Sequence, residues 1–436
     1  MQVAMRHRRC ARIFLHVSRP VRRSRASSRG TSVLASVANA RYRHKMKSLK
    51  PSVVMLTPDR QIDRRILLSA DSLEAAGWDV TIIAMPLDAQ SANDDRRVVR
   101  IGSDAGPAKR ENRVLDAYRW VRGHVPMNGR LMRWMKRLAW RYVVDQESFY
   151  SKLFYSTASH YSPRVFVAND LPMLPVAKQL AAACGARLVY DSHELYSEQE
   201  FSDREKRRWA EIEAKYIGAC DVVITVNQSI ATELEHRYGV SDVRVIYNAE
   251  RTRNTPAVSR RFHEAFGLPV DKRIVLLQGG LSAGRNLEVL VDAMRYVKDP
   301  SVVLVVLGDG LLLRSLQKMA QQEGLAGRVY FHAAVPQNEL LALTAAADAG
   351  VIPYQATCLN NHYCTPNKLF EFIAAGLPIL ATDLPEIRRL VEGQQIGQVG
   401  DTGSPQKLAA LIDDFFSSEQ RFATWKSRVS VVRQLI

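Results

Sequence analysis

Residues 364–382, with the sequence CTPNKLFEFIAAGLPILAT, combine residue types that can bind a phosphorylated ligand. Thr365 is a suitable N-cap, Pro366 suits the first position of a helix, and Gly376 would end that helix. The first N–H groups of a helix lack partners within it and carry partial positive charge, so they can bind an anion such as a pyrophosphate. Glu371, about one and a half turns further along, can accept hydrogen bonds from two ribose hydroxyls. The stretch predicts a nucleotide-diphosphate site; an ordinary capped helix is the alternative.

Glycine-rich turns follow two predicted strands in the same half of the chain. Residues 279–286, GGLSAGRN, place Gly279 and Gly280 where a backbone can approach a phosphate closely. Arg285 can neutralise that phosphate with a forked donor. Gly308 opens a second turn, GDG. The spacing is not the G-x-G-x-x-G of dinucleotide-binding proteins, but together with the predicted helix it indicates a phosphate site.

The first half of the chain carries polar residues at the ends of predicted strands. His193 follows a strand at 187–190 and lies beside Asp191, at the sheet edge where open α/β sheets bind ligands. A histidine there can stabilise charge or donate a proton; a purely structural role is the alternative. The loop after the strand at 52–56 lies at the same edge, and solvated charges are the alternative to a substrate contact there. The candidates for contact with an acceptor substrate at this edge are Asp59, Arg60, Asp63, Asp191 and His193.

The elements that position these residues alternate between apolar strands and helices. In the first half we expect strands at 52–56, 79–84, 164–168, 187–190, 221–226 and 243–247, and in the second half at 273–278, 302–307, 329–331, 349–352 and 378–381. Helical crossovers between strands require parallel sheets. We therefore predict an α/β protein with two Rossmann-like domains, at 51–250 and 272–418, joined by a linker at 251–271. Residues 419–436 form a C-terminal helix, a candidate to return to the first domain.

The charge of the chain is concentrated at its beginning. The net charge is +17, yet residues 1–50 hold 14 Lys and Arg and no Asp or Glu, so the remaining 386 residues carry only +3. A nearly neutral body argues against nucleic-acid binding. Three interpretations fit residues 1–50: a disordered basic arm, an organellar transit peptide, or sequence upstream of a true start at Met46. We favour the last.

Other features bear on localisation. The five cysteines show no C-x-x-C pair or metal-ligand spacing and indicate reduced thiols in a cytoplasmic protein. No run of about 18 apolar residues predicts a transmembrane helix. Residues 130–142 place Trp and Leu on one helical face beside an arginine stripe, which is typical of a helix on an anionic membrane surface. The alternative is a surface helix that packs its apolar stripe on its own domain.

From about residue 52 to its end, the chain resembles glycosyltransferase family 4, whose fold is GT-B. The similar segments are YDSHE at 190–194, the turn at 279–285, GDG at 308–310, and 365–378. The resemblance implies two Rossmann-like domains facing a cleft. The second would hold a sugar nucleotide and the first an acceptor. It also implies transfer with retention of configuration and without a metal. The chain agrees in that it contains no D-x-D motif, the carboxylate pair that binds a metal and the diphosphate in the other major glycosyltransferase fold.

The resemblance also assigns roles to single residues. Arg285 matches the family's lysine that contacts the donor diphosphate, and Glu371 matches the second glutamate of the E-x7-E motif, which binds the ribose. The backbone at Pro366 and Asn367 would face the phosphates. His193 matches the histidine beside the reacting sugar carbon. The predicted catalytic residues are thus His193, Glu371 and Arg285.

Two positions depart from the family pattern. Tyr363 stands where the first glutamate of E-x7-E belongs, so a sugar hydroxyl would be contacted by Tyr363 or by His362. Gly280 replaces the arginine that precedes the diphosphate lysine. Lys368 is a nearby substitute if its side chain points inward. These changes leave the donor undetermined.

We therefore expect a retaining, metal-independent glycosyltransferase with no cofactor besides its sugar-nucleotide donor. The acceptor would be a hydroxyl of a glycan, a lipid-linked sugar or a small molecule. The expected location is the cytoplasm, at the inner face of the membrane if residues 130–142 contact lipid. The alternatives are a sugar-nucleotide epimerase of the same fold and a non-catalytic binding protein.

Overall fold

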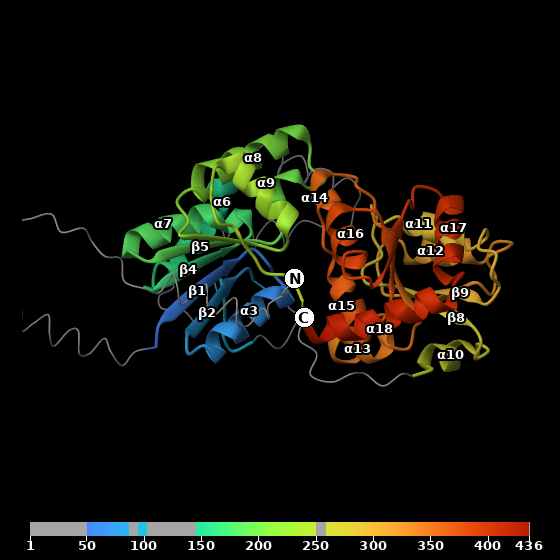
Figure 1. Ribbon diagram of the computed structural model, residues 1–436. Helices are drawn as coiled ribbons and strands as arrows, with labels where there is room; N and C mark the ends of the chain where they lie inside the picture. The colour runs from blue at the N-terminus through green and yellow to red at the C-terminus, as the bar shows by residue number, and fades with distance from the viewer. Residues whose placement is uncertain (1–49, 87–94, 103–144, 250–258, 436) are drawn as a thin grey trace, which may run out of the picture.

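The computed structural model describes residues 50–86, 95–102, 145–249 and 259–435. Two α/β domains, each built on a parallel sheet, lie side by side (Figure 1). The first sheet has seven strands in the order β3-β2-β1-β4-β5-β6-β7. Its strands are β1 (Ser52–Thr57), β2 (Asp79–Ala84), β3 (Val98–Arg100), β4 (Val165–Asn169), β5 (Arg187–Ser192), β6 (Val222–Thr225) and β7 (Arg244–Val245).

The helices of the first domain begin where the sequence supplies caps. Asp63 accepts a hydrogen bond from the backbone of Arg65 at the start of α3, and Ser202 and Glu205 form a capping box on α8. Asn227 caps α9. The helices are α3 (Arg64–Ala75), α6 (Gln146–Ala158), α7 (Leu174–Cys184), α8 (Asp203–Ile217) and α9 (Gln228–Tyr238), with 3₁₀ turns η1 (Leu171–Met173) and η2 (Tyr196–Glu198).

The second sheet has six strands in the order β10-β9-β8-β11-β12-β13. Every residue of β9 is buried, as expected for a strand of a parallel sheet covered on both faces. The strands are β8 (Arg273–Gln278), β9 (Val302–Leu307), β10 (Val329–His332), β11 (Ala349–Ile352), β12 (Ile379–Thr382) and β13 (Gly397–Gly400). Strands β3 and β13, both short and at sheet edges, were not predicted from the sequence.

Helix α15 (Asn367–Ala375) packs closely on the second sheet. Its side chains Leu369, Phe372 and Ile373 are buried. A Cβ added to Gly350 of β11 would lie 2.3 Å from the ring of Phe372. The missing side chain in β11 therefore lets this helix approach the sheet. The other helices of the domain are α10 (Arg261–Phe266), α11 (Leu287–Ala293), α12 (Leu313–Ala320), α13 (Gln337–Thr344), α14 (Leu359–His362), α16 (Pro385–Val391), α17 (Pro405–Phe416) and α18 (Glu419–Leu435).

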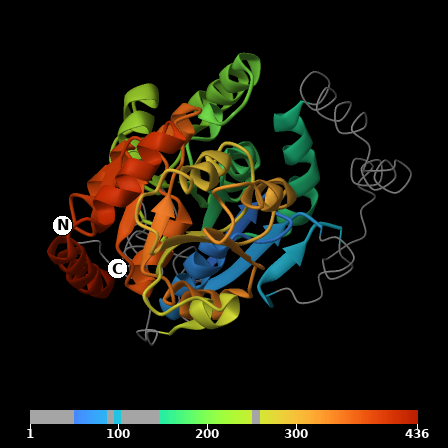
Figure 2. The same cartoon turned by 90° about the vertical axis from the view of Figure 1, so that its right-hand side faces the viewer.

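Two segments outside the sheets belong to the second domain. Helix α10 lies within the stretch predicted as a linker, and its Phe262 is fully buried in the second domain's core. Helix α18 packs on α15 and α17, and its Val429 and Val432 join the same core. In Figure 2, which turns the second domain toward the viewer, the dark red end of α18 lies at its side.

Several predictions concern residues outside the described ranges. These are the basic segment 1–50, except for Lys50, and the amphipathic helix at 130–142. Within the described ranges, no helix combines the length and apolar character needed to cross a bilayer.

Candidate active site

A cavity of about 400 Å³ lies between the two domains, at the carboxyl ends of both sheets. Residues from both domains line it, as expected for a ligand site at the switch edge of α/β sheets. The predicted site residues that it brings together are His193, Gly279, Gly280, Arg285, Pro366, Asn367, Lys368 and Glu371.

The helix that was predicted to bind phosphate starts one residue later than expected. Pro366 is the N-cap rather than the first helical residue, and α15 begins at Asn367. Thr365 is therefore not the cap, and its hydroxyl lies 3.3 Å from Nδ2 of Asn227 in the first domain. The start of α15 still faces the cavity, because both Pro366 and Asn367 line it.

Glu371 is held in place by a chain of hydrogen bonds inside the second domain. Nε2 of Gln278, at the end of β8, donates to Oε2 of Glu371 at 2.5 Å. The hydroxyl of Thr344 in turn donates to Oε1 of Gln278 at 2.8 Å. Gln278 is 1% exposed, so the carboxylate has a fixed position at the cavity wall. Gln278 was not among the predicted site residues.

Two cations lie on the same side of the cavity, over one aromatic ring. The guanidinium carbon of Arg285 lies 5.6 Å from the ring centre of Tyr354, and Nζ of Lys368 lies 4.9 Å from it. Nη1 of Arg285 also donates to the carbonyl of Gly280 at 2.9 Å. The side chain of Lys368 points into the cavity. This meets the condition under which Lys368 could replace the arginine that the family has at the position of Gly280.

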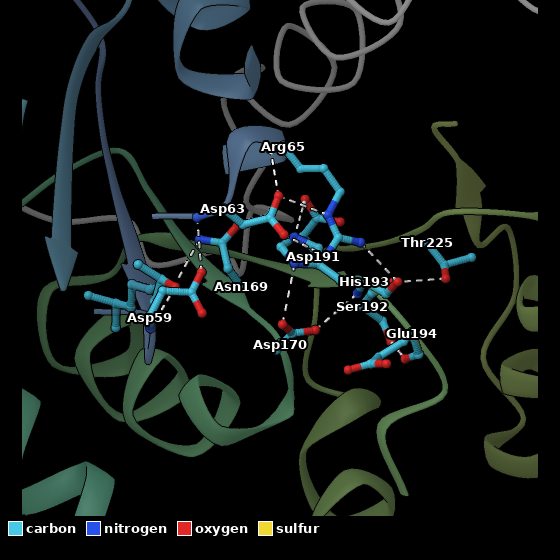
Figure 3. A network of polar contacts seen from close by, with 12 residues as sticks. Asp59, Asp63, Arg65, Asn169, Asp170, Asp191, Ser192, His193, Glu194 and Thr225 are labelled. Atoms are coloured by element: carbon cyan, nitrogen blue, oxygen red, sulfur yellow. Dashed lines mark hydrogen bonds and ion pairs between the residues drawn. The ribbon is translucent and has the colours of Figure 1, made fainter. Parts of the chain in front are cut away.

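His193 lies between two carboxylates in the first domain (Figure 3). Its Nδ1 lies 3.3 Å from Oδ2 of Asp170, and its Nε2 lies 3.4 Å from Oδ2 of Asp191. Burial lowers the pKa of His193, but the two carboxylates outweigh both burial and the nearby Arg65 and raise that pKa to about 10. The ring is therefore a cation at neutral pH, able to donate a hydrogen bond or stabilise negative charge but not to accept a proton.

Asp170 and Arg65 complete this network, and neither was predicted. Asp170 follows β4 with φ 64° and ψ 161°, a backbone region that is almost exclusive to glycine. In this strained conformation its Oδ1 accepts from the backbone N–H of His193 at 3.1 Å. Nη1 of Arg65 donates to the carbonyl of His193 at 3.2 Å. Both residues thus hold His193 at the cavity wall.

The acceptor candidates in the β1–α3 loop are partly occupied by local contacts. Asp63 caps α3 and pairs with Arg65, which outweighs burial and lowers the pKa of Asp63. Burial raises the pKa of Asp59, whose Oδ2 accepts from the backbone of Asp63 at 3.3 Å. Asp63 lines a second cavity of about 820 Å³ between α3, α13 and α15. Asp59 and Arg60 line neither of the two cavities.

Three residues predicted on the donor side, Tyr363, His362 and Gly308, lie outside the cavity wall. Tyr363 packs against the core of the first domain, and its carbonyl accepts from Nδ2 of Asn227 at 2.7 Å. His362 does not line the cavity either; from α14, Asn360 and Asn361 do. A Cβ on Gly308 would lie 2.1 Å from the carbonyl oxygen of the Gly279 turn, so Gly308 allows that turn to sit where it does.

Hydrogen bonds join the two domains at the rim of the cavity. Oδ1 of Asn360 accepts from the backbone N–H of Leu195 at 3.0 Å, and its Nδ2 donates to Glu194 at 2.9 Å. The hydroxyl of Ser229 donates to Glu386 at 2.7 Å. Among the described residues there is no group of three side chains suited to hold a metal ion.

Comparison with known families agrees with this arrangement. Residues 62–249 match the model of Glycosyltransferase Family 4, and residues 258–430 match that of Glycosyl transferases group 1. The chain belongs to glycosyltransferase family 4. This confirms the resemblance seen in the sequence, and the two parallel sheets are those of a GT-B fold.

The relatives of this family member are distant. A D-inositol 3-phosphate glycosyltransferase of Xylanimonas cellulosilytica is 25% identical, over 48% of the chain and 52% of the relative. The lipopolysaccharide core biosynthesis glycosyltransferase LpsE of Rhizobium meliloti is 26% identical, over 45% of the chain and 54% of the relative. The chain thus spans about half the length of these curated relatives.

Solved structures match a larger share of the chain. Alr3699/HepE of Anabaena, in complex with UDP and glucose, has a TM-score of 0.61 at 18% identity, over 88% of this chain and 94% of that one. Sucrose-phosphate synthase of Thermosynechococcus elongatus has a TM-score of 0.63 at 16% identity, with the same coverage. At these identities the likeness shows the fold alone.

Proposed function

We propose that this family 4 member is a glycosyltransferase that moves a sugar from a nucleotide-diphosphate sugar to a hydroxyl of an acceptor. The acceptor is a glycan, a lipid-linked sugar or a small molecule. One observation carries the proposal: cations, a helix start and a fixed carboxylate meet in one cavity, opposite His193 of the other domain. The relatives named above are glycosyltransferases, which favours this function over an epimerase or a silent binding protein.

The second domain holds the donor in this proposal. The backbone at Gly279 and the start of α15 bind the diphosphate, and Arg285 supplies positive charge. Glu371, oriented by Gln278, accepts hydrogen bonds from the ribose. Charge that grows on the departing nucleoside diphosphate is stabilised by groups already in place, and this lowers the barrier to transfer.

The first domain presents the acceptor. The hydroxyl attacks from the face that the leaving group departs from, so that the configuration at the sugar carbon is retained. The departing phosphate takes the hydroxyl proton. His193, held as a cation by Asp170 and Asp191, cannot act as the base and instead orients the sugar and the phosphate. Domain closure excludes water from the reaction.

Basic side chains take the place of a metal ion in this scheme. Arg285 and Lys368 lie beside the proposed diphosphate position, so we propose that transfer needs neither a metal nor a further cofactor. We also propose that the reaction takes place in the cytoplasm, and that residues 130–142 contact the membrane when the acceptor is carried on a lipid.

A donor panel followed by a transfer assay tests the function. A sugar nucleotide present at 100 times its Kd is expected to stabilise the protein by about 2.7 kcal/mol in a thermal shift experiment. With the stabilising donor, nucleoside diphosphate release that depends on an acceptor indicates transfer, and NMR of the product gives its anomeric configuration. Donor conversion without an acceptor would indicate an epimerase. Unchanged biological function in Glu371→Ala and Arg285→Ala would indicate a binding protein.

A further inference from the structure

Lys368 carries a buried amine that has no anionic partner among the residues that the structure describes. Its side chain is 6% exposed, at the second residue of α15, and it points into the cavity. Within the described ranges no carboxylate or carbonyl forms an ion pair or hydrogen bond with Nζ, whose contact is with the face of Tyr354. Buried charges in proteins are normally paired, so this ammonium lacks an anion.

The charged and titratable groups around Lys368 come from both domains. The first domain contributes Arg65, His193 and Glu194 to the cavity wall. The second domain contributes Arg285, Tyr354, Cys364 and Glu371. Burial, and then the positive charge of Arg285, lower the pKa of Lys368 to about 7, although Glu371 acts in the opposite direction. In the empty cavity, Lys368 is thus charged in only about half of the molecules at pH 7.

Lys368 lies beside the glycine turn at 279–286, in which Gly280 replaces the arginine of the family pattern. A Cβ on Gly279 would lie 3.8 Å from Nζ of Lys368, and a Cβ on Gly280 would lie 3.5 Å from Nη1 of Arg285. The two cations therefore flank the two glycines whose backbone would contact a diphosphate. Gly280 itself offers no side chain, and Arg285 alone is a single charge against a dianion.

We propose that Lys368 is the second cation of the donor diphosphate, in place of a side chain at position 280, and that it takes up a proton from solvent when the donor binds. This inference rests on the proposed function, since it requires a diphosphate in this cavity. The bound anion provides the missing partner and favours the charged form of the amine. Donor affinity is then coupled to pH through one residue of the binding site.

Titration calorimetry with sugar nucleotides measures this coupling. UDP-glucose, UDP-N-acetylglucosamine and GDP-mannose are suitable probes, because a diphosphate diester has no group that titrates near neutral pH. For a probe that binds, measurements at pH 7.5 in buffers of different ionisation enthalpy are expected to show uptake of about three quarters of a proton. The affinity is expected to fall about tenfold from pH 6 to pH 8 as the free lysine loses its charge.

Substitutions separate the charge of Lys368 from its packing. Lys368→Met is expected to weaken binding at pH 6 by about 10- to 100-fold and to abolish proton uptake. Lys368→Arg keeps a permanent charge, so it is expected to bind without proton uptake and with a flat pH profile. Lys318→Met, on the exposed face of α12, is the control and is expected to behave like the wild type.

A second substitution tests directly whether a cation at position 280 can replace the cation at position 368. A Cβ at Gly280 would meet only ordinary contact with Arg285, and the backbone there has no positive φ, so position 280 can carry a side chain. The double variant Gly280→Arg with Lys368→Met is expected to regain affinity without proton uptake. Wild-type binding without uptake, or equal binding by Lys368→Met, would overturn this inference and leave the proposed function standing. Failure of the wild type to bind any sugar nucleotide in the panel would overturn both.

Discussion

Replacing Asp170 by Asn tests whether His193 is a permanent cation. Asn keeps the size of the side chain and is among the non-glycine residues found most often at positive φ, but it removes the charge 3.3 Å from Nδ1 of His193. At that distance, and with an effective dielectric constant of about 20, the charge pair is worth about 5 kcal/mol. One pKa unit corresponds to about 1.4 kcal/mol, so the pKa of His193 is expected to fall by about three and a half units.

The wild-type ring is expected to stay doubly protonated up to about pH 9, because its pKa is about 10. In Asp170→Asn it is expected to titrate near or below pH 7. NMR of the imidazole nitrogens, with ¹⁵N-histidine labelling, follows both. The exposed Asp79, at the start of β2, provides the control variant Asp79→Asn, which is expected to leave the titration unchanged.

The protonation of His193 is also expected to affect the free energy of unfolding. The pKa of His193 is higher in the folded than in the unfolded protein, so its contribution to the free energy of unfolding is complete below about pH 6.5 and is lost as the pH rises through about 10. Urea unfolding from pH 6 to 10 is expected to show this loss in the wild type and a much smaller one in Asp170→Asn. A wild-type His193 that titrates near 6.5, or identical titrations in both proteins, would refute the reasoning.

Three further predictions concern the donor domain. Glu371→Gln is expected to lower kcat/KM about 10- to 100-fold through the loss of a charged acceptor for the ribose, with little change in unfolding; an unchanged kcat/KM would remove Glu371 from the site. Gly308→Ala is expected to lower the free energy of unfolding by about 2 to 4 kcal/mol in urea, because φ of Gly308 is 151° and the new Cβ would lie 2.1 Å from a backbone carbonyl oxygen. The control variant Gly218→Ala places its Cβ where no atom lies within 4 Å, so it is expected to leave the unfolding unchanged. Gly350→Ala is expected to lower the free energy of unfolding by about 1 to 3 kcal/mol in the same assay, because the new Cβ displaces the ring of Phe372. The double variant Gly350→Ala with Phe372→Leu is expected to regain part of this stability. Full stability of Gly350→Ala would contradict the close packing of α15.

The sequence predicted the features that depend on neighbouring residues. The buried strands β1 and β9 and the glycine turn at 279–286 carry their signals within a few residues. The start of α15 was predicted one residue early, because both Thr365 and Pro366 suit a helix start and only the backbone geometry decides between them.

Residues that act across long separations in the chain were missed. Gln278 reaches Glu371 only because β8 and α15 end at the same edge of the sheet. Asp170 follows β4 and reaches His193 after β5 because these two strands are neighbours in the first sheet. A rule that every polar residue directly after a buried parallel strand is a candidate would have found Asp170. The outward position of Tyr363 depends on its packing against the other domain, for which the local sequence carries no signal.

The short helix α14 belongs to the second domain by sequence but is attached to the first. Leu359 and Tyr363 pack against the first domain's core, and Asn360 is bonded to Leu195 and Glu194. Only residues 364–366 separate this anchor from α15. Any widening of the cleft must therefore either detach α14 or pull on the first turn of α15. Release of the spent nucleotide and separation of the domains would then be mechanically linked through a tether of three residues.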